Sequence, residues 1–490
     1  MKVLYIASEA RPFIASGGLA DVAGSLPLSL KRKGVDCRVV IPLYSKISEP
    51  LLKQVHFITK FESPVSWRRR YCGVFQAEHE GVIYYFIDNE YYFKRPTLYD
   101  EYDNGERFAF FSRAVLEMLP YIDFWPDVIN ANDWQTALVP IYHNIYYSKD
   151  ERYSGIKTVF TIHNIAFQGK YGFDLYNDTL GLPDSAIGLI EYDRCVNLMK
   201  GAIQAANSIV TVSPSYANEI SGRHNDTSGY DFGQGLTPFI AAESHKLIGI
   251  LNGVDTSSMN PRLDANLYRR YDARDFKTGK AANKLWLRER LGLQQNADVP
   301  LIGIVTRIDP EQKGCQLILE ALGDGLLDRN EAQFVILGSA ADSDFEGKQL
   351  ENDFRNVESR YRGRAVAYIG FVPELAQKIY AASDIYLMPS KYEPCGLSQI
   401  IAMKYGAIPV VRETGGLSDT VRDSLGGDGN GFTFKNYSSR ELSDAIERAL
   451  AGFKIKSGWY ILTRRAMKCD FSWDSGSANE YIALFERLVG

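Results

Sequence analysis

Two short stretches with almost the same sequence, Ser16-Gly-Gly-Leu-Ala-Asp-Val22 and Thr414-Gly-Gly-Leu-Ser-Asp-Thr420, lie near opposite ends of this chain. Each follows an apolar run typical of a buried strand and opens a run typical of a helix. A hydroxyl side chain, two glycines and a helix start together present backbone N–H groups to an anion. One such element in each half predicts two halves that bind one phosphorylated ligand.

Around the second stretch, short apolar runs alternate with helix-like runs. We expect strands at 301–306, 333–337, 365–369, 384–388 and 408–411, and helices at 316–322, 374–382 and 398–405. The first half repeats the pattern, with strands at 2–7, 37–42, 128–131, 158–161 and 208–212 and a helix at 21–33. Alternation at this spacing predicts parallel sheets with right-handed crossovers. The expected fold class is therefore α/β, with two doubly wound domains and an active cleft between them, at the carboxyl ends of the strands.

The chain length, a polar stretch near the middle and an amphipathic segment at the end of the sequence predict the domain boundaries. At 490 residues the chain is too long for one ordinary core. A polar stretch at 221–243 is typical of a long loop, so we place the first domain at 1–247 and the second at 248–469. The end of the chain has apolar residues on one helical face, and we expect this helix, within 470–490, to complete the first domain. The apolar residues of that face are Tyr481, Leu484, Phe485 and Leu488.

Composition and charge disfavour several classes of protein. The net charge of −5 argues against a broad nucleic-acid surface. The six cysteines and six histidines show no metal-ligand spacing, so we expect no metal and cysteines that stay reduced. The chain starts with a strand pattern rather than a signal peptide, and no apolar run is long enough to cross a membrane. These features predict a cytoplasmic protein without a membrane partner, and they carry no signal for an oligomeric state.

Two local concentrations of residues have alternative interpretations. Several of the 30 tyrosines gather in 84–102, where they either stack on sugar rings or belong to strands and core; the second role is favoured for most of them. The run Arg68-Arg69-Arg70 is interpreted as a solvated edge rather than a binding patch.

Three successive strand ends of the second half carry residues suited to a phosphorylated sugar. Arg307 follows one strand, and Lys313 lies six residues later at a helix start, so the two cations can clamp a diphosphate. Glu393 lies in the loop Glu393-Pro-Cys-Gly-Leu397, where a carboxylate can accept hydrogen bonds from hydroxyl groups. The glycine pair Gly415-Gly416, directly after Thr414, follows the next strand. Each residue alone is also compatible with a solvated surface or with a carboxylate near a helix start, but the set favours a binding site.

The first half offers two further candidates. His163 ends a strand, and this position favours a ligand contact over the alternative of a buried structural histidine. Asp133 lies in Asn130-Ala-Asn-Asp-Trp-Gln135 at another strand end, where a functional and a structural role are equally favoured.

Taken together, these motifs resemble the bacterial glycogen synthase and plant starch synthase family, which are retaining glycosyltransferases of the GT-B fold (glycosyltransferase family 5). The resemblance covers the chain from Met1 to the C-terminal helix. It includes Arg95-Pro-Thr-Leu-Tyr99, Glu106-Arg-Phe-Ala-Phe-Phe-Ser-Arg113, Val212-Ser-Pro-Ser-Tyr216, Ile250-Leu-Asn-Gly-Val-Asp255 and Phe471-Ser-Trp-Asp474.

The resemblance implies two Rossmann-like domains and transfer of glucose from ADP-glucose to the non-reducing end of an α-1,4-glucan, with retention and without a metal or other cofactor. It implies that Arg307 and Lys313 hold the diphosphate, that Glu393 orients the donor glucose and that His163 contacts it near the reacting carbon. The residues implied in catalysis are Glu393, His163, Arg307, Lys313 and Asp133. Those implied in substrate binding are Ser16, Gly17, Gly18, Asp21, Arg95, Tyr99, Asn164, Cys395, Gly396, Leu397, Thr414, Gly415 and Gly416.

The chain departs from the family pattern in three places. Ala15 stands where the family usually has a lysine beside the donor phosphate, and Asn130-Ala-Asn-Asp-Trp-Gln135 replaces His-Ala-His-Asp-Trp-His. The segment from Arg307 to Lys313 is one residue longer than usual. Two alternatives therefore remain: a related transferase with another donor such as UDP-glucose, and a glucan-binding paralogue with reduced or no turnover. A pyridoxal-phosphate-dependent phosphorylase is disfavoured. Because the four charged or imidazole residues of the site are present, we favour an active enzyme.

Overall fold

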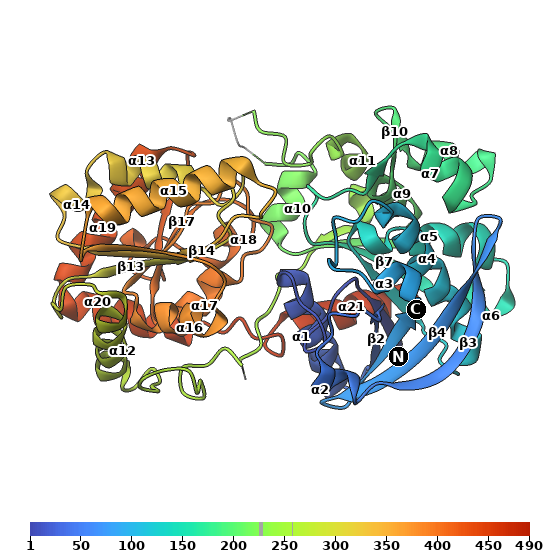
Figure 1. Cartoon of the computed structure of the whole chain (residues 1–490), viewed down its shortest axis with the longest axis horizontal. Helices are drawn as coiled ribbons and strands as arrows, with labels where there is room; N and C mark the ends of the chain where they lie inside the picture. The colour runs from blue at the N-terminus through green and yellow to red at the C-terminus, as the bar shows by residue number, and fades with distance from the viewer. Residues whose placement is uncertain (225–228, 257) are drawn as a thin grey trace. The chain divides into compact units, whose positions relative to one another are not determined.

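The computed structural model describes residues 1–224, 229–256 and 258–490, and the chain divides into two compact units (Figure 1). Unit 1 comprises Met1–Gly253 and Ser472–Gly490, and unit 2 comprises Val254–Phe471. The chain passes from unit 1 to unit 2 after Gly253 and returns to unit 1 after Phe471. Both points lie slightly later in the sequence than the expected boundaries after 247 and 469. The first is later because strand β12 (Leu247–Gly249) still pairs with β11 (Ser208–Thr211) in the sheet of unit 1.

Unit 1 contains a nine-stranded sheet with the order β12-β11-β7-β6-β1-β2-β5-β4-β3. Its strands from β12 to β5 are parallel, as expected. The other strands of this parallel part are β1 (Lys2–Ile6), β2 (Asp36–Pro42), β5 (Val82–Asp88), β6 (Val128–Asn132) and β7 (Lys157–Ile162).

The remaining edge of this sheet is antiparallel and was not among the expected strands. Strands β3 (His56–Val65) and β4 (Arg68–His79) form a hairpin, and β4 also pairs antiparallel with β5. Glu80 and Gly81, which join β4 to β5, have φ values of 49° and 80°. A two-residue connection with both φ angles positive is a hairpin turn that suits the twist of antiparallel strands. The Glu-Gly pair was the sequence signal for this edge.

Helices pack on both faces of the large sheet. Several short helices and strands follow β7 in the sequence. The larger helices are α1 (Gly18–Arg32), α4 (Asn104–Glu117), α9 (Leu198–Ala205) and α10 (Pro214–Ile220). A second sheet with the order β8-β10-β9 consists of Lys170–Tyr171, Cys195–Asn197 and Glu191–Tyr192. The stretch 221–243, expected to be a loop, contains helix α11 (Thr237–Ala242); its residues 225–228 lie outside the described part of the chain.

Unit 2 is a doubly wound domain with a six-stranded parallel sheet, as predicted. Its strand order is β15-β14-β13-β16-β17-β18, and helices cover both faces (Figure 1). The strands are β13 (Leu301–Val305), β14 (Gln333–Gly338), β15 (Ala365–Ile369), β16 (Ile385–Met388), β17 (Ile408–Arg412) and β18 (Phe432–Phe434). The helices include α12 (Phe276–Leu291), α13 (Cys315–Gly323), α15 (Phe345–Arg360), α16 (Pro373–Ala382), α17 (Ser398–Lys404), α18 (Gly415–Thr420), α19 (Ser439–Lys454) and α20 (Lys456–Lys468).

The C-terminal helix α21 (Ser477–Val489) belongs to unit 1 and packs against α1. Its apolar face is buried through Tyr481, Leu484 and Phe485, and Trp473 just before it is also buried. All six cysteines are free thiols, and four of them are buried. In the described residues, no helix combines the length and apolar character that a membrane span requires.

Candidate active site

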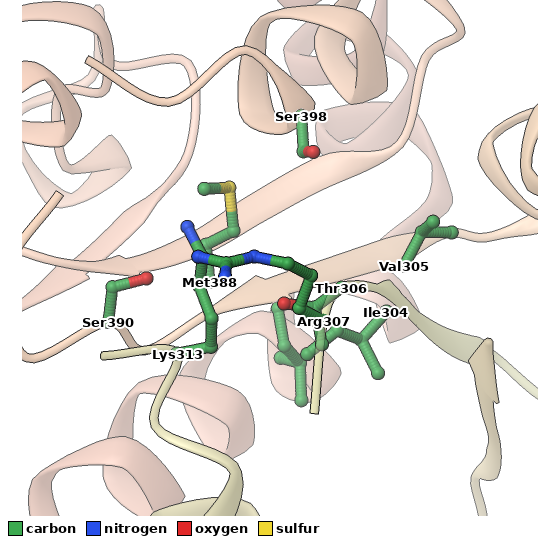
Figure 2. A pocket seen from close by; sticks show the side chains of 9 residues that line it. Ile304, Val305, Thr306, Arg307, Lys313, Met388, Ser390 and Ser398 are labelled. Atoms are coloured by element: carbon green, nitrogen blue, oxygen red, sulfur yellow. The ribbon is translucent and has the colours of Figure 1, made fainter. Parts of the chain in front are cut away.

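A small pocket of about 140 Å³ lies at the carboxyl ends of β13 and β16 in unit 2 (Figure 2). Its polar lining is formed by Thr306, Arg307, Lys313, Ser390 and Ser398. Figure 2 shows Arg307 and Lys313 among the side chains that line the pocket, close to Met388 in this view. Because pockets that enclose a whole ligand measure roughly 300–1,000 Å³, this space suits one group of a larger ligand.

The loop between β13 and α13 fixes the two cations of the pocket. Asp309 accepts hydrogen bonds from the backbone N–H groups of Glu311 and Gln312, at 2.9 and 2.8 Å. Gln312 is buried, and its side-chain oxygen accepts a 3.2 Å hydrogen bond from the Arg307 guanidinium. The Arg307 side chain remains 60% exposed, so its charge is open to a ligand from solvent.

Gly314 lets the same loop approach the neighbouring strand end. It has a φ of 70°, and a Cβ atom there would lie 2.2 Å from the carbonyl oxygen of Pro389. Only glycine fits this position. The close approach brings Lys313 beside the loop that follows β16.

Lys313 and Glu393 form an ion pair in this pocket. The Lys313 Nζ lies 2.8 Å from Glu393 Oε2, and the Ser390 hydroxyl donates to the same oxygen at 3.0 Å. The two side chains are 18% and 7% exposed. The carboxylate balances the ammonium charge. Arg307 is the less compensated cation of the pocket, because its ion pair with Asp309 is longer, at 3.8 Å, and its side chain is 60% exposed.

The glycine pair after β17 meets the Glu393 loop through the backbone. The Gly416 N–H donates to the Glu393 carbonyl at 3.1 Å. A Cβ on Gly416 would lie 2.2 Å from the Cys395 carbonyl oxygen. This amide was expected to face an anion, and in the structure it instead ties α18 to the Glu393 loop. In unit 1, the Ser16 N–H donates to the Glu9 carboxylate.

In unit 1 the ends of β6 and β7 bring Asp133 and His163 together. Asp133 has a φ of 56°, and its Oδ1 accepts hydrogen bonds from the backbone N–H groups of His163 and Asn164, at 2.7 and 3.4 Å. The His163 ring nitrogen Nε2 lies 2.9 Å from Asn132 Oδ1. Since the amide oxygen only accepts, Nε2 carries the proton and Nδ1 is left as the acceptor nitrogen of the ring.

Burial sets the charge of both residues. It raises the pKa of Asp133 to about 7, against the hydrogen bonds from His163 and Asn164, which lower it. It lowers the pKa of His163 to about 3, so the imidazole is neutral at physiological pH.

Glu9, which was missed at the sequence level, lies in the same region. It follows β1, is buried, and holds the start of the Ser16–Gly18 segment through the Ser16 N–H. Burial raises the pKa of Glu9 to about 7, the hydrogen bonds from Ser16 lower it, and the nearby Asp21 carboxylate adds to the rise. Beside it, the Tyr99 and Ser8 hydroxyls share a 2.8 Å hydrogen bond. The signal for Glu9 was a polar pair, Ser8-Glu9, directly after a buried strand.

Comparison with known proteins agrees with this geometry. Residues 2–242 match the starch synthase catalytic domain family, and residues 299–452 match glycosyl transferases group 1. The glycogen synthase of Clostridium perfringens is 45% identical over 493 aligned positions, covering 100% of this chain and 98% of the relative. That of Geobacillus stearothermophilus is 44% identical with the same coverage. The chain belongs to the glycogen synthase and starch synthase family.

Solved structures place this family member in the GT-B fold. The catalytic domain of starch synthase IV from Arabidopsis thaliana, determined with ADP and acarbose, is 35% identical and superposes with a TM-score of 0.88 over 99% of both chains. Sucrose-phosphate synthase from Thermosynechococcus elongatus shares only the fold, with a TM-score of 0.61 at 16% identity. The family expected from the sequence motifs is thus confirmed, and the chain is a glycosyltransferase.

The predicted site residues of this family member fall into separate groups. Arg307, Lys313, Glu393 and Gly416 lie together in unit 2, and Asp133, His163 and Asn164 lie together in unit 1. Two predicted residues are engaged elsewhere: Arg95 donates to Asp103 at 2.8 Å, and Asp21 pairs with Arg11 at 2.5 Å. The remaining predicted residues are Ser16, Gly17 and Gly18, exposed at the start of α1, Tyr99 beside Ser8, Cys395, Gly396 and Leu397 in the loop before α17, Thr414 directly before α18, and Gly415 as the first residue of α18. Among the described residues, no group of three or more His, Cys, Asp or Glu side chains is placed to hold a metal ion.

Proposed function

We propose that this chain is an ADP-glucose:α-1,4-glucan glucosyltransferase that adds glucose to the non-reducing end of a glucan with retention of configuration. The observation that carries the proposal is the pocket with Arg307 and the Lys313–Glu393 pair at the strand ends of unit 2. It occurs in a chain that aligns along its whole length with glycogen synthases. We further propose that it acts in the cytoplasm.

In this proposal unit 2 binds the diphosphate of the donor. Glycosyl transfer passes through an oxocarbenium-like state while negative charge grows on the leaving phosphate. The exposed Arg307 guanidinium and the Lys313 ammonium would stabilise that charge more in the transition state than in the ground state. Glu393, held by Lys313 and Ser390, would accept hydrogen bonds from the hydroxyls of the donor glucose.

Unit 1 contributes a neutral imidazole in this proposal. With its Nε2 proton directed to Asn132, His163 keeps an unprotonated Nδ1 that can accept a hydrogen bond from a glucose hydroxyl. Asp133 fixes the backbone that follows β7 and so positions the imidazole. The two residues would set the place of the transferred glucose rather than exchange protons with it.

Because Arg307 and Lys313 place positive charge at the proposed diphosphate site, we propose that the reaction needs no metal and no other cofactor. Turnover that is unchanged by EDTA would support this part of the proposal. Loss of activity in EDTA that is restored by Mg²⁺ or Mn²⁺ would contradict it.

The deciding experiment measures initial rates of nucleoside diphosphate release from ADP-glucose and from UDP-glucose, each with and without glycogen. Release that depends on glycogen and favours ADP-glucose supports the proposal. A preference for UDP-glucose would identify a transferase with another donor. No release from either donor, with retained glycogen binding, would identify a glucan-binding paralogue.

A further inference from the structure

Two tyrosines of the 84–102 segment are not used by the core or by the candidate active site. Tyr84, Tyr85 and Tyr92 are buried, in agreement with the role expected for most of this segment. Tyr91 and Tyr102, in contrast, expose 57% and 82% of their surface. Exposed aromatic rings that lie close together call for a functional explanation.

The Arg95 guanidinium contacts both of these rings. Its central carbon is 5.3 Å from the centroid of the Tyr91 ring and 5.5 Å from that of Tyr102. Arg95 is itself fixed, because it donates to the Asp103 carboxylate at 2.8 Å and to the Tyr91 carbonyl at 2.9 Å. The two rings are therefore held in place before any ligand arrives, which lowers the entropy cost of binding.

Charged side chains surround the two rings. The Arg70 guanidinium lies 5.6 Å from the centroid of the Tyr91 ring and pairs with Glu106 at 3.6 Å. Its neighbour Arg68 bridges Glu106 and Asp178 and is largely covered. Of the arginine run that was interpreted as a solvated edge, Arg70 contacts the platform, Arg68 is held in ion pairs and Arg69 is exposed.

We propose that this platform, consisting of Tyr91, Arg95 and Tyr102, binds the glucan chain of the acceptor at a distance from the reacting end. This inference rests on the proposed function for the identity of the acceptor. A pyranose ring has an apolar C–H face that stacks on an aromatic ring, and hydroxyl groups that bond to charged side chains at its rim. The platform offers both kinds of contact: the exposed surfaces of two tyrosine rings, and the carboxylates and guanidiniums of the surrounding side chains.

The position of the platform along the chain supports this ligand. Tyr102 is three residues from Tyr99, so their Cα atoms are at most about 11 Å apart. Tyr99 contacts Ser8 just after β1, in the region of unit 1 that contains Glu9. A glucan whose end lies at these strand ends has further glucose units within reach of the platform. A protein partner is disfavoured because two rings are far smaller than the roughly 800 Å² per side of a stable protein interface.

The experiment measures glycogen binding without a donor, by retardation of the protein in native gels that contain glycogen, for the Tyr91→Ala/Tyr102→Ala variant. We expect its dissociation constant for glycogen to rise about tenfold. Tyr91→Phe/Tyr102→Phe keeps the ring faces and should bind nearly as tightly as the unsubstituted chain. Tyr268→Ala is the matched control, because Tyr268 is a tyrosine of unit 2 that is 64% exposed. This substitution should leave the dissociation constant for glycogen unchanged.

Kinetics give a second, independent measurement. In the double alanine variant, the KM for glycogen should rise about tenfold, while kcat with maltotriose and the KM for ADP-glucose stay unchanged. Glycogen binding equal to that of the unsubstituted chain, or an equal loss in Tyr268→Ala, would overturn the platform. If the rings prove necessary for glycogen binding but no donor is turned over, the proposed function fails and the platform stands.

Discussion

At the scale of single residues, Arg307 and Lys313 are both cations of one pocket, but their surroundings predict different behaviour on substitution. Arg307→Ala should lower kcat by about 10²–10³-fold, the usual cost of losing a group that stabilises developing negative charge. It should lower the melting temperature less than Lys313→Ala does, because the Arg307 side chain is exposed and its loss removes one hydrogen bond to Gln312. Lys313→Ala should lower kcat as strongly. It should also lower the free energy of unfolding by up to about 3 kcal/mol, because it leaves Glu393 buried without its partner.

Turnover with ADP-glucose and glycogen, together with thermal unfolding, checks this prediction. Arg329→Ala serves as the control, because Arg329 forms an exposed ion pair with Glu447 elsewhere in unit 2. Near-normal turnover in Arg307→Ala and Lys313→Ala would show that the pocket is not the donor site. Equal stability of the two variants would contradict the structural role of the Lys313–Glu393 pair.

Ala15 is exposed in the segment before α1, at the position where the family usually has a lysine. If the donor phosphate lies beside this segment, Ala15→Lys adds a favourable charge interaction and should lower the KM for ADP-glucose several-fold. The KM for glycogen should not change. Donor titrations at saturating glycogen measure the effect, and an unchanged donor KM would mean that the site is organised differently in this chain.

Glu9 makes the stability of unit 1 depend on pH. The folded chain holds its proton up to a pH of about 7, whereas the unfolded chain releases it near an ordinary glutamate pKa of about 4.3. Between these values the folded state binds more protons, so the free energy of unfolding falls as pH rises, by at most about 1.4 kcal/mol per pH unit. Glu9→Gln keeps an oxygen for the Ser16 N–H but has no proton to lose, so its decline should be shallower.

Urea denaturation at pH 5, 6 and 7 measures this difference. His163, with its pKa lowered to about 3, acts in the opposite direction, because its neutral form makes stability rise with pH up to about 6.5. That effect is present in both chains and cancels in the comparison. Parallel curves for Glu9→Gln and the unsubstituted chain would show that Glu9 is already ionised at pH 5.

At the scale of elements, the loop after β16 and the turn that begins α18 depend on one glycine. A Cβ on Gly416 would lie 2.2 Å from the Cys395 carbonyl oxygen, so Gly416→Ala must displace the segment that carries Glu393. We expect a loss of about 1–3 kcal/mol of unfolding free energy and at least a tenfold lower kcat. Gly323→Ala is the matched control, since Gly323 ends α13 with no atom within 4 Å of an added Cβ, and it should not lower stability.

The elements also show what the sequence could and could not predict. Each strand of the parallel sheets that we expected is present within about two residues, because a buried parallel strand is a short apolar run whatever surrounds it. The edge β3–β4 was missed because exposed and charged residues interrupt its strands, so neither is a continuous apolar run. The Lys313–Glu393 pair was also missed: the two residues were predicted as separate ligand contacts, and their meeting depends on the approach of Gly314 to Pro389, which lies far along the chain.

At the scale of the whole molecule, the core of unit 1 depends on residues from both the first part of the sequence and the segment Ser472–Gly490. Val254 and Phe471, the ends of unit 2, are joined by a 2.9 Å backbone hydrogen bond, and the chain after them returns to place Trp473, Tyr481 and Phe485 in the core of unit 1. Phe485→Ala should therefore remove about 3–5 kcal/mol from the stability of unit 1 alone. In amide hydrogen exchange, β1 and α1 should become less protected while β13 and β14 keep their protection. Val489→Ala, on the exposed side of the same helix, should change neither. Equal loss of protection in both units would mean that they unfold together, and no loss in β1 would mean that α21 adds little to the core it covers.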